Sequence, residues 1–111
     1  MDVKEGIMVS PLENINDLDL WLIIANHYKQ FPYKFFRIQK VDLVFRVEFI
    51  IDEIDEKEEK LILMYDFETD TPIVSGTSSV LKNLSPATIE KHKQYFKDLV
   101  YKYSIKNYLA K

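Results

Sequence analysis

Cysteine is absent from this chain of 111 residues, and glycine occurs only twice. Without cysteine the chain can form neither a disulfide nor a thiolate metal site, and it has no thiol nucleophile. This composition is typical of a reducing cytoplasm, which is the location we expect. With so little glycine, the chain also lacks the spaced glycines of a phosphate-binding loop.

Long apolar runs are missing as well. No segment approaches the roughly 20 uncharged apolar residues that a membrane helix needs. The first residues, Met1 to Glu5, do not show a basic segment followed by an apolar run, which is the pattern of a secretion signal. We therefore expect a protein without membrane association.

The composition that is present favours a folded globule. Hydrophobic residues make up 47% of the chain and aromatic residues 14%, at a mass of 13.2 kDa. These values predict a single domain over residues 1–111, with residues 1–9 as a flexible arm or an edge strand. The many lysines, isoleucines and tyrosines suggest a bacterial or phage origin.

Charge is unevenly distributed although the net charge is only −3. Residues 52–70 hold nine acidic residues against two lysines, whereas residues 90–111 hold six lysines against Glu90 and Asp98. The chain thus has an acidic middle and a basic end, and a weak net charge excludes no class of partner.

The stretch from Val41 to Phe67 predicts a long β-hairpin. Apolar residues fall on every second position of 41–52 and again of 60–68, which is the pattern of strands with one buried face. The charged segment 53–59 is then the loop. Both inward sets have odd numbers, and we expect opposed residues to have numbers that sum to 112. That register pairs Phe49 with Leu63, and on the outer face Asp52 with Lys60 and Arg46 with Asp66.

Helices are predicted on both sides of this hairpin. The first begins at Ser10-Pro11 or at Asn16 and ends near Lys29, although its apolar centre, 20–25, also fits a buried strand. The last begins at Ser85-Pro86, a serine cap followed by proline. Strands are expected at 33–39, followed by a brief kink near Gln39 or Lys40 that leads into the hairpin, and, interrupted by Gly76, at 73–81. The fold class is α+β: an N-terminal helix, an antiparallel sheet of three or four strands and a C-terminal helix packed on the sheet.

Surplus apolar surface indicates a protein that acts through contacts with other proteins. The first helix is apolar nearly all round, the outer face of the hairpin carries apolar residues, and tyrosines lie off the main stripe of the last helix. We expect a non-enzymatic homodimer, or an adaptor or inhibitor of another protein. The candidate interface residues are Trp21, Ile24, Tyr28, Ile50, Ile62, Met64, Tyr101, Ile105 and Tyr108.

Nucleic-acid binding is the alternative. Basic and aromatic residues interleave in 29–40 and in the last helix, and such residues bind phosphates and stack on bases. The candidate residues are Lys34, Arg37, Lys93, Lys97 and Lys102.

Catalytic and metal sites find little support. The hydroxyl-rich segment 75–79 and the acidic segment 52–59 lack the spacing of a phosphate loop or a calcium loop, and His27 and His92 have no partner at ligand spacing. We expect no enzyme activity, no cofactor and no metal. A small apolar ligand between the sheet and the helices stays open as a third hypothesis.

Overall fold

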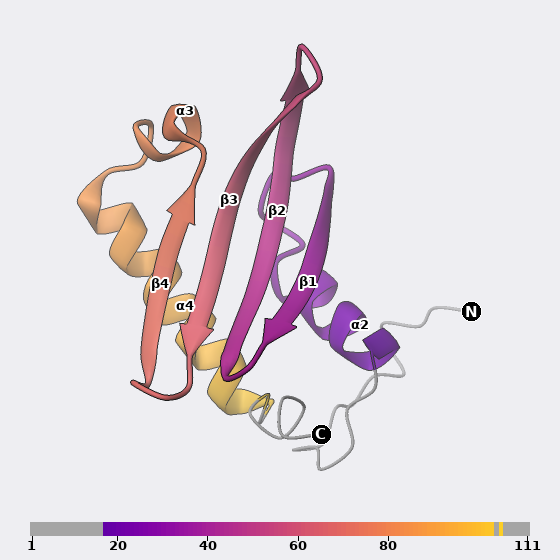
Figure 1. Ribbon diagram of the computed structural model, residues 1–111, viewed down its shortest axis with the longest axis vertical. Helices are drawn as coiled ribbons and strands as arrows, with labels where there is room; N and C mark the ends of the chain where they lie inside the picture. Colours follow the sequence, from indigo (N-terminus) through magenta and orange to yellow (C-terminus); the bar gives the residue numbers. More distant parts are fainter. Residues whose placement is uncertain (1–16, 104, 106–111) are drawn as a thin grey trace.

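The computed structural model describes residues 17–103 and residue 105, and these form one antiparallel sheet with helices behind it (Figure 1). The sheet has four strands in the order β1-β2-β3-β4, so each strand pairs with its neighbours in sequence. The predicted α+β class is confirmed. The elements are α2 (Asp17–His27), β1 (Phe35–Val41), β2 (Val44–Ile54), β3 (Lys57–Asp66), β4 (Thr71–Gly76), α3 (Ser78–Leu81) and α4 (Pro86–Lys102).

Alternation along β2 and β3 separates the two faces of the sheet, as predicted. Phe45, Val47 and Phe49 are fully buried on the face that meets α2 and α4. Each buried side chain of this size stabilises the fold by roughly 1.5–3 kcal/mol. Their partners on β3 are Leu61, Leu63 and Tyr65, and the helices contribute Leu20, Ile23, Ile24, Phe96, Leu99 and Val100.

The register of the hairpin differs from the predicted one. Opposed residues such as Phe49 and Leu61 have numbers that sum to 110, not 112. The predicted outer pairs are therefore wrong: Asp52 lies opposite Glu59, and Arg46 lies opposite Met64.

The cause is a short turn combined with a bulge. Only Asp55 and Glu56 form the turn, and both have positive φ, the backbone pattern of a type I′ turn. Next to this turn, Ile54 pairs with Lys57. If the same register continued along both strands, the inward residues of β2 would share a face with the outward residues of β3. An irregularity between Ile50 and Asp52 adds one residue to β2, and this restores the match of the apolar faces.

The first strand also differs from the prediction. A kink near Gln39 was expected to lead into the hairpin, but β1 continues to Val41 and reverses tightly at Asp42 and Leu43. Asp42 has a φ of 53°, a conformation that aspartate tolerates better than most residues. The chain therefore gains a second hairpin, β1–β2, where a bend was predicted.

The predicted start of the last helix is confirmed. Ser85 caps α4 by accepting a hydrogen bond from the backbone N–H of Thr88, and Pro86 occupies the first turn, as predicted. The segment 20–25 is helical and not a strand. The proposed caps at Ser10 and Asn16 lie outside the described residues.

The predicted strand 73–81 is wrong beyond Gly76. β4 ends there, and the next residues form the short helix α3. Gly76 has a φ of 149°, and the backbone N–H of Thr77 donates to the carbonyl of Lys60. A Cβ atom at position 76 would lie 2.5 Å from that carbonyl oxygen. Only glycine permits the chain to leave the sheet so close to β3.

Replacing Gly76 with alanine is expected to lower the free energy of unfolding by about 2 kcal/mol, since a strained backbone of this kind costs about 1–3 kcal/mol. Urea unfolding monitored by circular dichroism measures the loss. Ser75→Ala, one residue earlier on β4, is the matched control and should change stability by less than about 0.5 kcal/mol. Equal losses in the two variants would contradict this account of Gly76.

Candidate functional site

One face of the sheet is left open by α2 and α4, which lie behind the other face, while the short helix α3 lies beyond the end of β4 (Figure 1). We call the uncovered face the open face. Strand pairing places its side chains in rows that run across the sheet. From the end near Asp42 upward, the rows are Val41–Val44–Asp66–Thr71, Gln39–Arg46–Met64–Ile73, Arg37–Glu48–Ile62–Ser75 and Phe35–Ile50–Lys60.

A buried carboxylate lies at the centre of the open face. Glu48 is only 4% exposed. One of its oxygens accepts hydrogen bonds from Arg37, with an Nη2–Oε1 distance of 3.1 Å, and the other accepts from Arg46. The Nζ atom of Lys60 lies 3.6 Å from Oε1 of Glu48. The carboxylate of Glu58 also accepts a hydrogen bond from Arg37. We call Arg37, Arg46, Glu48, Glu58 and Lys60 the ion cluster.

The cations determine the titration of Glu48. Burial tends to raise the pKa of its carboxyl, but the hydrogen bonds from Arg46 and Arg37 and the charge of Lys60 outweigh burial. The pKa of Glu48 is therefore held below its ordinary value, so the group is ionised at neutral pH. Removal of one partner from such a group leaves an uncompensated buried charge, which is destabilising.

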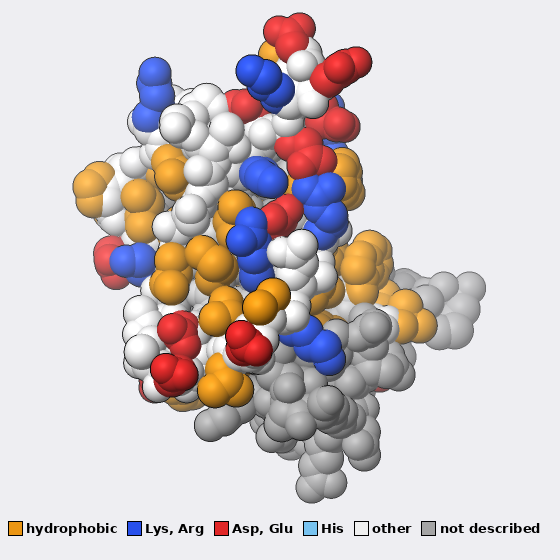
Figure 2. Space-filling model, in the orientation of Figure 1, with side chains coloured by type: hydrophobic (Ala, Val, Ile, Leu, Met, Phe, Trp, Pro, Cys, Tyr) orange, Lys and Arg blue, Asp and Glu red, His pale blue; other side chains and the backbone are white. Residues whose placement is uncertain are grey.

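Apolar side chains gather next to the ion cluster. Val41 is 62% exposed and Ile73 37% exposed, and Val44 and Met64 between them are half-buried. We call these four residues the apolar patch. Figure 2 shows hydrophobic side chains over the lower part of the sheet, with acidic side chains next to them and several basic ones above. The acidic border includes Asp66 and the exposed Glu68 of the β3–β4 turn.

The predicted interface residues do not form one surface. Trp21 is 46% exposed and stacks on Phe36 of β1, whereas Tyr101 is 55% exposed and donates to Asp70 near β4, at the opposite side of the strand order. Met64 lies on the open face, with Ile62 nearly buried beside it. Buried within the chain itself are Ile24, Tyr28, Ile50 and Ile105, while Tyr108 lies outside the described residues.

The predicted nucleic-acid residues are separated and already engaged within the chain. Arg37 belongs to the ion cluster on the open face, whereas α4 lies behind the sheet (Figure 1). Lys34 pairs with Asp52 and Lys93 pairs with Glu90. Lys97 and Lys102 lie over the rings of Tyr101 and Tyr103, respectively.

Sequence reasoning missed the ion cluster because its members come from three strands. The signal was available in part: Arg37, Arg46 and Glu48 each fall between apolar residues, and Lys60 directly precedes the apolar residue Leu61. Their convergence, however, depends on the register, and the expected register placed Arg46 opposite Asp66.

The described residues give no support to a metal site or a membrane span. Within the described residues, no three histidine, cysteine or acidic side chains are grouped as metal ligands. None of the described helices combines the length and apolar character required to cross a membrane. Comparison with protein families, with curated proteins and with solved structures gave no match.

Glu48→Gln is expected to lower the free energy of unfolding at pH 7 by about 1–3 kcal/mol, the usual cost of leaving buried polar partners unmatched. Because the pKa of Glu48 is lower in the folded chain, its contribution is complete above the unfolded value of about 4.3 and is lost as pH falls through the folded value. The stability difference between wild type and variant should therefore shrink toward pH 3.

Urea unfolding at pH 7 and pH 3 tests this expectation. Glu58→Gln is the control within the same cluster, because Glu58 has a more exposed side chain and should contribute less than Glu48. A difference between wild type and Glu48→Gln that is constant across this pH range would show that the charge of Glu48 is unimportant.

Proposed function

We propose that the protein acts through protein–protein contacts made by the open face, and that its first partner is a second copy of the same chain. The observation that carries the proposal is the apolar patch on a sheet face that no described helix covers. Contiguous exposed apolar residues bordered by polar ones are typical of interaction surfaces. The proposal includes no catalytic step.

The order of charges along the open face favours self-association. The two rows that hold the apolar patch also hold Arg46 of the ion cluster and Asp66 of the acidic border, and Glu68 lies in the adjoining β3–β4 turn. The ion cluster has three cations against two carboxylates. A two-fold axis through the patch would bring the acidic border of one copy opposite the cations of the other. Two-fold interfaces require such self-complementarity, because the same surface is used twice.

The ion cluster suits this role because it needs no rearrangement. The carboxylate of Glu48 already has its hydrogen-bond partners within one chain, so docking leaves no unpaired buried charge at the centre of the contact. Arg37 and Arg46 still expose 42% and 33% of their side chains, which permits further contacts across an interface.

Nucleic-acid binding is less well supported by this geometry. Arg37 of β1 and the helix α4 lie on different sides of the sheet, so a single strand or duplex cannot contact both at once without wrapping around the molecule (Figure 1). An adaptor or inhibitor role, with a different protein on the open face, uses the same surface. A cytoplasmic location and a bacterial or phage origin complete the proposal.

Size-exclusion chromatography with light scattering should give a mass near twice 13.2 kDa for the untagged chain. Ile73→Lys combined with Val41→Lys should weaken the dimer at least roughly tenfold, because each lysine places a charge in the apolar patch. Both positions are exposed on their strands, so the fold should persist.

The control is Leu18→Lys, which places a lysine at a residue of α2 that is 66% exposed, behind the sheet. The control should keep the dimer. A monomeric wild type at high concentration, or equal dissociation by both changes, would overturn self-association through the open face. Salt-sensitive DNA or RNA binding abolished by charge reversal at Lys97 and Lys102 would favour the alternative function instead.

A further inference from the structure

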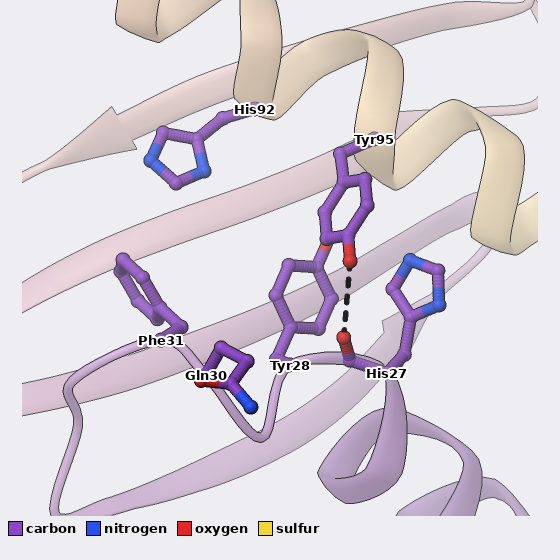
Figure 3. Close-up of a pocket in the computed structure, with 6 residues that line it drawn as sticks. All are labelled: His27, Tyr28, Gln30, Phe31, His92 and Tyr95. Carbon is purple, nitrogen blue, oxygen red and sulfur yellow. Dashed lines mark hydrogen bonds between the residues drawn. The ribbon is translucent and has the colours of Figure 1, made fainter.

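Two adjoining cavities lie behind the sheet, between α4 and the segment that follows α2. Their volumes are about 270 and 220 Å³, and both are lined by His92 and Tyr95. An apolar cavity of roughly 150 Å³ is enough to hold a benzene ring. The remaining described lining residues are Thr88 and Lys91 in the larger cavity, and His27, Tyr28, Gln30 and Phe31 in the smaller (Figure 3).

Aromatic rings dominate the lining. The Phe31 and His92 rings meet edge to face at 5.3 Å between centroids, and Tyr95 lies 4.4 Å from His27 and 5.4 Å from Tyr28. Burial lowers the pKa of His92, and burial with the nearby charge of Lys102 lowers that of His27 although Asp98 opposes it. Both imidazoles are thus neutral rings at pH 7, and flat rings of this kind stack on aromatic ligands.

Among the described residues, two buried polar atoms at this place lack a hydrogen-bond partner. They are Nε2 of His27 and the hydroxyl of Tyr28, and each belongs to a residue that lines the smaller cavity. The ring of Tyr95 lies against both residues, and a hydrogen bond of 3.3 Å from its hydroxyl to the carbonyl of His27 holds it there (Figure 3). Buried polar groups without partners are rare in proteins and call for an explanation.

The charge of the lining selects among ligands. Lys91 is the one charged side chain among the described residues that line the two cavities, and none of those residues is acidic. Asp98 lies on the same helix but lines neither cavity, and it accepts a hydrogen bond from Gln94. An anionic group on the ligand is therefore favoured over a cationic one.

We propose that this groove binds a small planar aromatic carboxylate. The ring packs among Phe31, His92 and Tyr95, and the carboxylate pairs with Lys91 at the opening of the larger cavity. This site is separate from the open face, which lies on the other side of the sheet.

NMR titration of the full chain with 2-naphthoate tests the proposal, with the imidazole signals of His27 and His92 as reporters. We expect saturable shifts of both rings with a Kd of about 1 mM or below, which is ordinary for a ligand of this size. Lys91→Gln should weaken binding roughly tenfold through loss of a charge-assisted hydrogen bond. Lys93→Gln on the same helix is the matched control and should bind as wild type, because Lys93 pairs with Glu90 and lines neither cavity.

Two further probes separate ring from charge. Cyclohexanecarboxylate carries the charge without an aromatic ring, and 2-naphthalenemethanol carries the ring without the charge, so each should bind at least roughly tenfold more weakly than 2-naphthoate. Binding of either as tight as that of 2-naphthoate would overturn the assigned ligand class. Imidazole signals that do not move with 2-naphthoate, in a chain that remains folded, would overturn the site itself.

Discussion

The alternation of side chains along β2 and β3 is the constraint on which the rest of the structure depends. It buries Phe45, Val47 and Phe49 against the helices, and it turns Arg46 and Glu48 to the opposite face. With the two-residue turn at Asp55 and Glu56 alone, the apolar residues of β2 would lie opposite the polar residues of β3. The extra residue in β2 after Ile50 brings the apolar residues of both strands onto the same face. Burial of the core thus outweighs the cost of two positive φ angles and an interrupted ladder.

The same alternation produces the open face and its ion cluster. Arg37, Arg46 and Lys60 surround the carboxylate of Glu48 at the centre of this face. With Glu58, the ion cluster has three positive and two negative charges, so its net charge is +1. A face of this kind attracts phosphates only weakly, since its cations are committed to carboxylates. The exposed side chains next to it are apolar, and that combination favours a protein partner.

The faces of the hairpin and the start of α4 could be predicted because each depends on local sequence: period-two alternation, and the Ser85-Pro86 pair. The register could not, because Asp55 is followed by Glu56 and not by the glycine that sequence rules associate with a two-residue turn. α3 was missed because the close approach of Gly76 to Lys60 is a contact between strands. The ion cluster and the histidine-lined groove unite residues distant in sequence, so no local pattern announces them.

Intermolecular NOEs in a mixture of labelled and unlabelled chains test the central claim most directly. Our account predicts NOEs between the methyl groups of Met64, Val41 and Ile73 of one copy and those of the other. NOEs confined to Trp21 or to the outer side of α4 would place the contact elsewhere. Their complete absence in a sample whose measured mass is that of a dimer would contradict the assignment of the open face.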